Sequence, residues 1–219
     1  MPALERLAAR YRVIAPDLLG FGESDRPDWL DTTTDYVYHL LDLWDALDLG
    51  QAHLVGVSLG GWIAAEFATV ASHRLRSLTL VDALGLEVSS APILDLFALS
   101  FEEQVRAMFF HPAQAEPYLQ PLDREGQLRR LKGQVTAARV GWNPLLVNPK
   151  LRLRLHHIGV PTLVIWGAQD RVAPVEVAEA WHSAIAQARV AILPECGHLP
   201  PIEQPEGFCG AVEEFLATV

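Results

Sequence analysis

The sequence predicts an α/β fold in which a parallel β-sheet carries a helical cap insertion. Short runs rich in β-branched residues and leucine alternate with segments whose apolar residues recur at helical spacing. The alternation stops near residue 83 and resumes near residue 158, with only helical patterns and loops in between. We therefore expect a core formed by residues 1–83 and 158–219, with residues 84–157 as the cap.

The elements before the cap follow from hydrophobic periodicity and turn residues. We expect strands at residues 12–15, Ala52–Val57 and Leu75–Val81, and helices at residues 3–11, 33–47 and 59–72. A loop rich in glycine, proline and aspartate spans residues 16–31. Thr33 or Thr34 is placed to cap the helix that follows this loop.

After the cap, the strand pattern returns at residues 161–166 and 189–193, and helices are expected at residues 174–185 and 205–218. Pro174 and Pro205 stand at the two helix starts, where a residue without a backbone N–H is tolerated. Within the cap, an apolar face is formed by the side chains of Phe97, Phe101, Met108, Phe109 and Phe110. This face has two open interpretations, packing on the mouth of the sheet and lining an apolar substrate pocket.

Composition excludes several classes of protein. Half of the 219 residues are hydrophobic, so a sizeable core is available, and the formal charge of −10 disfavours nucleic acid. The charged start of the chain does not match a signal peptide, and no apolar run is long enough to span a bilayer. Cys196 and Cys209 alone make neither a disulfide framework nor a metal-ligand set. We expect a cytoplasmic protein without a membrane partner.

The strongest local motif lies at residues 56–61, Gly-Val-Ser-Leu-Gly-Gly, between a predicted strand and a predicted helix. A serine at such a turn needs small neighbours because its backbone is strained and crowded, and Gly56 and Gly60 meet that need. The turn presents the hydroxyl at the end of the sheet, beside free N–H groups of the helix. Ser58 is thus a candidate nucleophile, and a turn without chemistry is the alternative.

A serine nucleophile requires a histidine base and an acid that orients it. Asp170 and His198 each follow a predicted strand, and the carboxyl ends of parallel strands meet at one edge of a sheet. The chain order Ser58, Asp170, His198 is also the order of the triad in α/β-hydrolases. Asp82, at the end of another strand, is an alternative acid that we disfavour because the Asp170 motif is better.

From residue 11 to residue 215, the sequence resembles the α/β-hydrolase superfamily, in its branch of single-domain hydrolases with a helical cap. The matching segments are residues 13–25 after the early strand, the elbow at 56–61, and the closing motif at 197–200 with 203–205. The resemblance implies that Ser58 is the nucleophile, His198 the base and Asp170 the orienting acid. It also implies that the Leu59 N–H binds the oxyanion.

One departure from the family concerns the start of the chain. Members normally carry further N-terminal strands, one of which ends in a His-Gly loop that supplies a second oxyanion donor, and nothing in this sequence supplies it. In the resembled fold that strand lies between the segments 12–15 and 52–57. We therefore expect either that the strand at 12–15 pairs directly with the strand at 52–57, or that a second copy completes the sheet as a homo-oligomer.

The leading functional interpretation is a serine hydrolase for small uncharged carboxylic esters, with Trp62, Phe97, Phe101, Phe109 and Phe110 as candidate substrate-binding residues. The alternatives are hydrolysis of a C–C bond or a thioester, and a non-catalytic scaffold that binds an apolar ligand or a partner chain. No metal or organic cofactor is indicated. His156 and His157 lack further ligands, and Cys196 lacks an elbow, so we expect these residues to be bystanders.

Overall fold

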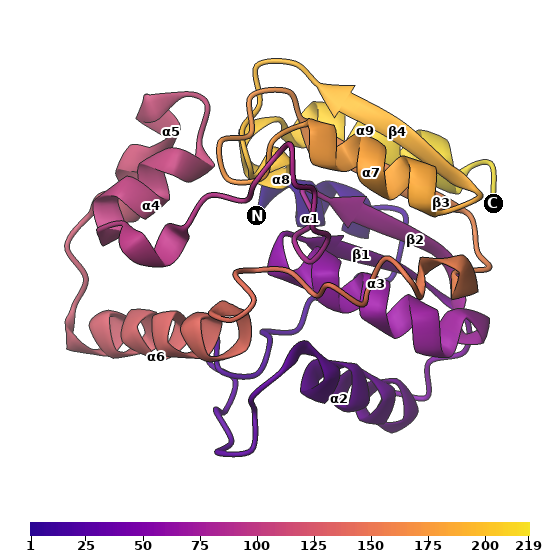
Figure 1. Cartoon of the computed structure of the whole chain (residues 1–219), viewed down its shortest axis with the longest axis horizontal. Helices are drawn as coiled ribbons and strands as arrows, with labels where there is room; N and C mark the ends of the chain where they lie inside the picture. The colour runs from indigo at the N-terminus through magenta and orange to yellow at the C-terminus, as the bar shows by residue number, and fades with distance from the viewer.

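The computed structural model describes all 219 residues and contains one four-stranded parallel sheet. Its strands lie in the spatial order β1 (Ala52–Val57), β2 (Leu75–Val81), β3 (Thr162–Gly167) and β4 (Ala188–Leu193). Their carboxyl ends point toward the helices that connect β2 to β3 (Figure 1). The predicted fold class is confirmed, and these four strands begin and end within one residue of the predicted bounds.

Helices cover both faces of the sheet (Figure 1). On one face lie α3 (Leu59–Ala71) and α7 (Glu176–Ala184), with α2 (Thr33–Ala46) packed on the outside of α3. On the other face, α1 (Pro2–Ala8) packs against α9 (Pro205–Leu216). Because both faces are covered, the strands are buried at the centre of the molecule and their carboxyl ends remain free to build a site.

Alternate side chains of the central strand β3 pack into two separate hydrophobic cores. Along β3, Val164 and Trp166 join the large core under α3 and α7, whereas Leu163 and Ile165 join the core under α1 and α9. This is the period of two expected when successive side chains point to opposite faces of a sheet. Since Trp166 and Ile165 are fully buried, β3 is locked in register and the loop that follows it starts from a rigid position.

The cap of α2 and the start of α7 differ from the sequence prediction. The N-cap of α2 is Thr32, one residue before the predicted Thr33, and the Asp35 carboxylate accepts the Thr32 backbone N–H at 2.7 Å. Helix α7 begins at Glu176, two residues after Pro174. The prediction for Pro205 is confirmed, because this residue opens α9.

The predicted strand at residues 12–15 is wrong. This segment makes no backbone hydrogen bond with β1, and its Val13 and Ile14 are 36% and 39% exposed. Its β-branched residues favour a strand only where a neighbour offers donors and acceptors, and the preceding helix α1 is held against α9 on one face of the sheet. The direct pairing that we expected therefore does not occur, and β1 keeps an open outer edge.

Only helices and loops connect β2 to β3, apart from one isolated bridge between Gly85 and Val147. The helices are α4 (Phe101–Met108), α5 (Pro112–Ala115), α6 (Arg124–Gly141) and the 3-10 turns η2 (Leu96–Ala98), η3 (Glu116–Leu119) and η4 (Leu155–His157). Two short elements complete the fold, η1 (Ser72–Arg74) and α8 (Pro200–Glu203). The exact bounds of the cap, 84–157, stay a prediction.

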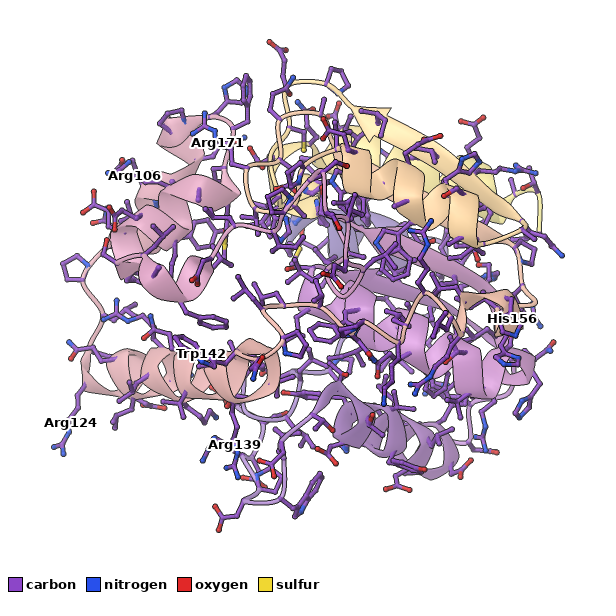
Figure 2. All side chains as sticks on the ribbon, viewed as in Figure 1. Arg106, Arg124, Arg139, Trp142, His156 and Arg171 are labelled. Carbon is purple, nitrogen blue, oxygen red and sulfur yellow. The ribbon has the colours of Figure 1, made fainter.

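Helix α6 is anchored to the loop before α2. Lys132 Nζ donates to the carbonyl oxygens of Gly22 and Ser24 at 2.9 and 2.8 Å. Arg139 forms an ion pair with Asp31 in the same loop and lies on the side of α6 nearest to it (Figure 2). These contacts join segments more than 100 residues apart, so α6 of the cap is held against the loop before α2.

Because the outer edge of β1 is open, we still expect that a second chain completes the sheet. We expect concentration-dependent association that weakens in Val55→Lys, because Val55 is 39% exposed on β1 and an edge lysine opposes strand pairing. Molar mass from light scattering after size exclusion, over a range of protein concentrations, measures this. Ile192→Lys is the matched control, because Ile192 is 43% exposed on β4 at the opposite edge. A wild-type monomer at every concentration would contradict the expectation.

Candidate active site

Ser58 sits on a strained turn between β1 and α3. It is the N-cap of α3 with φ 54° and ψ −119°, a conformation that L-residues rarely adopt. The turn is crowded, because a Cβ at Gly56 would lie 2.3 Å from the carbonyl oxygen of Gly60. The backbone of Ser58 is held by its N–H, which donates to Val81 O on β2 at 2.9 Å. The predicted nucleophile elbow therefore has the geometry that its glycines indicate.

The imidazole of His198 bridges the serine and an acid. His198 Nε2 lies 2.7 Å from Ser58 Oγ, and Nδ1 lies 2.7 Å from Asp170 Oδ2. An ionised carboxylate only accepts, so Nδ1 donates to Asp170 and Nε2 is left to accept the hydroxyl proton of Ser58. His198 is 1% exposed, and its bond to Asp170 is buried, whereas its bond to Ser58 is partly buried. The structure thus brings together the three residues that were predicted from separate strand ends.

Asp170 is held in place by its own loop. Its Oδ1 accepts the backbone N–H groups of Val172 and Ala173 at 2.7 and 3.1 Å, which leaves Oδ2 for the imidazole. Trp166 Nε1 donates to Ala173 O at 2.9 Å, so the loop is tied back to the buried end of β3. These donors fix the orientation of the carboxyl toward His198.

Asp82 is a second buried carboxyl beneath the site, but it is not the acid bonded to His198. It is fully buried at the end of β2, and its Oδ1 accepts the Gly167 N–H at 2.9 Å while Oδ2 has no partner. Burial, followed by repulsion from the Asp170 carboxylate, raises the pKa of Asp82 well above its ordinary value. Asp170 is therefore the acid bonded to His198, whereas burial favours the neutral form of Asp82.

A metal ion has little to bind in this cluster. Asp82, Asp170 and His198 have ligand-type atoms within 4.8 Å of one another. Both ring nitrogens of His198, however, are already bonded to Ser58 and Asp170. The cluster is therefore arranged for proton transfer between a hydroxyl and an imidazole.

Leu59, the predicted oxyanion donor, is the first residue of α3. The N–H groups in the first turn of a helix have no acceptor within that helix, and the helix dipole adds partial positive charge there. The Leu59 N–H is adjacent in sequence to the Ser58 hydroxyl, as an oxyanion donor must be. Its role in binding an oxyanion stays a proposal.

The five predicted substrate-binding residues have different surroundings. Trp62 is 3% exposed in the main core, and its Nε1 donates to the buried Glu66 at 2.7 Å. Phe109 is 2% exposed and belongs to a small cap core with Val105 and Ala115. Burial among other side chains explains both residues as packing, and the structure provides no contact that assigns them to a pocket.

The other three phenylalanines are half-buried and connect parts of the cap. The Phe97 ring lies 5.5 Å from the Trp142 ring at the end of α6, and the Arg130 guanidinium lies 4.3 Å above the Phe101 ring. The Phe110 ring stacks edge-on against His111. These contacts connect η2 and the start of α4 to α6. In Figure 1, α4 with α5 and α6 form the two arms of the cap.

Two surface pockets lie at the base of the cap. The larger has a volume of about 260 Å³, and the smaller, about 170 Å³, includes Trp62 in its wall. They share Pro144 and Val147, and neither is lined by Ser58 or His198. Trp62 thus borders a pocket, although one that the triad does not line.

Sequence reasoning assigned no role to Glu203 or to the backbone of the Met108–Phe110 segment. In the structure, His198 N–H donates to Met108 O, and the Glu203 carboxylate accepts N–H groups from both Gly197 and Phe110. Glu203 was quoted only as part of a closing motif. The available signal was a glutamate five residues after the base, flanked by prolines.

The expected bystander residues lie apart from this chemistry. Cys196 is fully buried, and burial raises the pKa of its thiol far above the ordinary value, so it stays a neutral packed residue. His156 lies on the opposite side of the molecule from the cap helices (Figure 2). No helix is both long and apolar enough to cross a bilayer.

Comparisons with known proteins agree with this geometry. Residues 2–211 match the alpha/beta hydrolase family. The chain is 32% identical to 2-hydroxy-6-oxo-2,4-heptadienoate hydrolase of Pseudomonas putida, over 99% of this chain and 81% of that protein. It is 33% identical to 2-hydroxymuconate semialdehyde hydrolase of Pseudomonas sp. strain CF600, over 98% of this chain and 79% of that protein.

Solved structures show the same fold. A meta-cleavage product hydrolase from Pseudomonas fluorescens IP01 superposes with a TM-score of 0.80 at 26% identity, covering 99% of this chain and 82% of that one. A thermophilic esterase from Thermogutta terrifontis superposes with a TM-score of 0.73 at 28% identity, covering 99% and 84%. The family match over residues 2–211 and the hydrogen-bonded serine, histidine and aspartate agree, and the chain belongs to the alpha/beta hydrolase family.

Proposed function

We propose that this protein hydrolyses a C–C bond next to a ketone in a 2-hydroxy-6-oxo-dienoate, through an acyl-enzyme on Ser58. The observation that carries a serine mechanism is the continuous chain from Ser58 Oγ through His198 to Asp170, with both links at 2.7 Å. The reaction type is supported by the relatives named as heptadienoate and muconate semialdehyde hydrolases. It replaces the carboxylic ester as the leading interpretation.

Acylation begins with the proton on Ser58. His198 Nε2 accepts that proton while Oγ adds to the ketone carbon, and the resulting oxyanion faces the Leu59 N–H. Cleavage takes place in the 2-oxo tautomer of the substrate, in which the 2-hydroxyl proton has moved to the carbon next to the ketone. Collapse of the adduct then breaks the C–C bond, and the electron pair leaves with the carbon chain as a dienolate conjugated with the 2-oxo group. The His198 imidazolium protonates this leaving carbon, so the serine ester and a neutral imidazole remain.

Deacylation uses the same groups with water as the nucleophile. His198 accepts a proton from water, hydroxide adds to the serine ester, and collapse returns the proton to Ser58 as the carboxylic acid leaves. Asp170 keeps the imidazole in one tautomer through both halves. Neither half requires a group outside this chain except substrate and water.

Ester hydrolysis is the second candidate, because it uses the same acyl-enzyme. The observation that favours it is the similarity to the thermophilic esterase, at 28% identity. The two substrate classes differ in charge, since a dienoate carries a carboxylate that a simple ester lacks. A cation in the cap would therefore separate them.

Arg130 is such a cation. It is half-buried on α6, over the Phe101 ring, and no carboxylate lies within salt-bridge distance of it. The neighbouring Arg129 and Arg139 are both paired with acidic residues. We propose that Arg130 is the cap residue that receives the substrate carboxylate.

Ser58→Ala is expected to abolish turnover of a 2-hydroxy-6-oxo-dienoate and labelling by a fluorophosphonate, because both need the activated hydroxyl. Loss of the dienoate absorbance and gel detection of the label measure the two effects. The fold should persist, since Ser58 is held by its backbone and not by its side chain's packing. Equal turnover in wild type and variant would contradict the nucleophile assignment, and a wild type that takes no label would favour a non-catalytic scaffold.

Asp170→Asn is expected to lower kcat by about 10³–10⁴-fold, because the amide no longer holds Nδ1–H of His198 in the tautomer that accepts the serine proton. Asp82→Asn is the matched control, since it replaces a carboxyl that we assign as neutral by its neutral isostere. We expect it to keep most of the activity. Steady-state rates at one saturating substrate concentration compare the two, and a larger loss in Asp82→Asn would reverse the acid assignment.

The same control has a distinct pH dependence. The folded state keeps the Asp82 proton, whereas the unfolded chain loses it above its ordinary pKa, so the unfolded state binds fewer protons and wild-type stability falls as pH rises. Asp82→Asn removes this dependence. Its Tm relative to wild type should therefore increase from pH 4 toward neutral pH, as measured by thermal unfolding.

Arg130→Met is expected to raise KM for a dienoate by about 10-fold or more, because a charge-assisted hydrogen bond worth roughly 1.5–3 kcal/mol is lost. KM for a short neutral ester should change little. Arg124→Met is the control, since Arg124 is exposed at the end of α6 farthest from the core (Figure 2). An equal effect on both substrates would contradict carboxylate recognition by Arg130.

A further inference from the structure

The cap rests directly on the loop that carries His198. The His198 N–H donates to Met108 O at 2.9 Å, at the end of α4. The contact leaves no room for a larger residue before the histidine, because a Cβ on Gly197 would lie 2.7 Å from Phe110 N and 2.8 Å from Met108 O. The backbone of the Met108–Phe110 segment is therefore the surface against which the histidine loop is placed.

Glu203 joins the two segments with one carboxylate. Its Oε1 accepts the Gly197 N–H at 2.9 Å, and its Oε2 accepts the Phe110 N–H at 2.7 Å. The residue is 6% exposed and has no cation within salt-bridge distance. Its position is fixed in turn, because α8 begins two residues after His198 and the Glu203 N–H donates to Leu199 O.

The chemistry of this site requires a carboxylate. Both partners are N–H donors, so both side-chain oxygens must accept, and a glutamine would place its NH₂ against one of the donors. A buried negative charge without a cation is costly, and here it lies close enough to Asp82 and Cys196 to raise the pKa of both. Packing alone does not explain a buried carboxylate at position 203. A requirement to hold the Met108–Phe110 segment and the histidine loop at a fixed distance does explain it.

We propose that Glu203 is a positioning residue that locks the cap segment Met108–Phe110 to the histidine loop, so that His198 stays aligned with Ser58 and Asp170. Gly197 and His198 are consecutive, and one is held by Glu203 while the other is held by the cap. Loss of the carboxylate frees both ends of this contact at once. The inference rests on the proposed serine mechanism, because it assigns the alignment of that triad to the cap.

The test uses Glu203→Gln and Glu203→Ala in the full chain. A small fluorophosphonate reports the reactivity of Ser58 without filling the cap, and its labelling rate should fall by about 10–100-fold, the range expected for a small misplacement of a catalytic group. The value of kcat for the dienoate should fall by a similar factor while KM changes little. Glu195→Gln is the matched control, because Glu195 lies in the same loop, is exposed, and makes no hydrogen bond through its side chain.

Hydrogen exchange adds a readout that does not depend on catalysis. In Glu203→Gln the His198 amide should exchange faster, although its acceptor is Met108 O and not Glu203. Where the alanine variant fails to fold, Glu203→Asp is used, since it keeps the charge but is one methylene too short to reach both donors.

The outcomes separate the two proposals. If wild type takes no label, the proposed function fails. The exchange rate of the His198 amide alone then tests whether Glu203 holds the cap segment against the histidine loop. If wild type is labelled and folded Glu203 variants are labelled equally fast, the positioning role is overturned and the serine mechanism stands. Slow labelling with an unchanged exchange rate of the His198 amide also overturns the positioning role of Glu203, because the cap would then have kept its place without this residue.

Discussion

The alignment of His198 with Ser58 and Asp170, through one hydrogen bond to each, depends on almost every other feature of this fold. His198 follows β4, Ser58 follows β1 and Asp170 follows β3, so the three groups come from strands spread across the entire sheet. They meet because parallel strands bring their carboxyl ends to the same edge. The register of the sheet is in turn held by two cores, one on each face, with Trp166 and Ile165 fully buried.

The site concentrates buried carboxyl groups in a place with little water. Asp82, Asp170 and Glu203 are all buried near His198, and no lysine or arginine is paired with any of them. Each is accommodated differently. Asp170 accepts two backbone N–H groups and bonds to the imidazole, and Glu203 accepts two backbone N–H groups. Burial raises the pKa of Asp82, which favours its neutral form. Backbone amides thus take the place of cations around Asp170 and Glu203.

The cap contributes more than a cover. On one side, Lys132 and Arg139 of α6 tie it to the loop before α2, and on the other the Met108–Phe110 segment contacts the histidine loop. Between these two attachments lie the half-buried Phe101 and Arg130, which combine an apolar ring with an unpaired cation. The two attachments thus hold the cap both to the loop before α2 and to the loop that carries His198.

The sequence by itself determined the sheet from residue 52 onward, the elbow and the identity of the three bonded residues. Ser58 could be found because Gly56 and Gly60 indicate a crowded turn, and Asp170 and His198 because each lies in the loop after a strand with a clear apolar pattern. Only the tertiary structure decided that residues 12–15 form no strand, since pairing depends on a neighbour that the local pattern cannot see. It also decided between Asp82 and Asp170 as the partner of His198, and it revealed the contacts of Met108, Phe110 and Glu203. Met108 and Phe110 lie roughly 90 positions from the residues they contact, and the spacing of residues along the chain carries no information about such contacts.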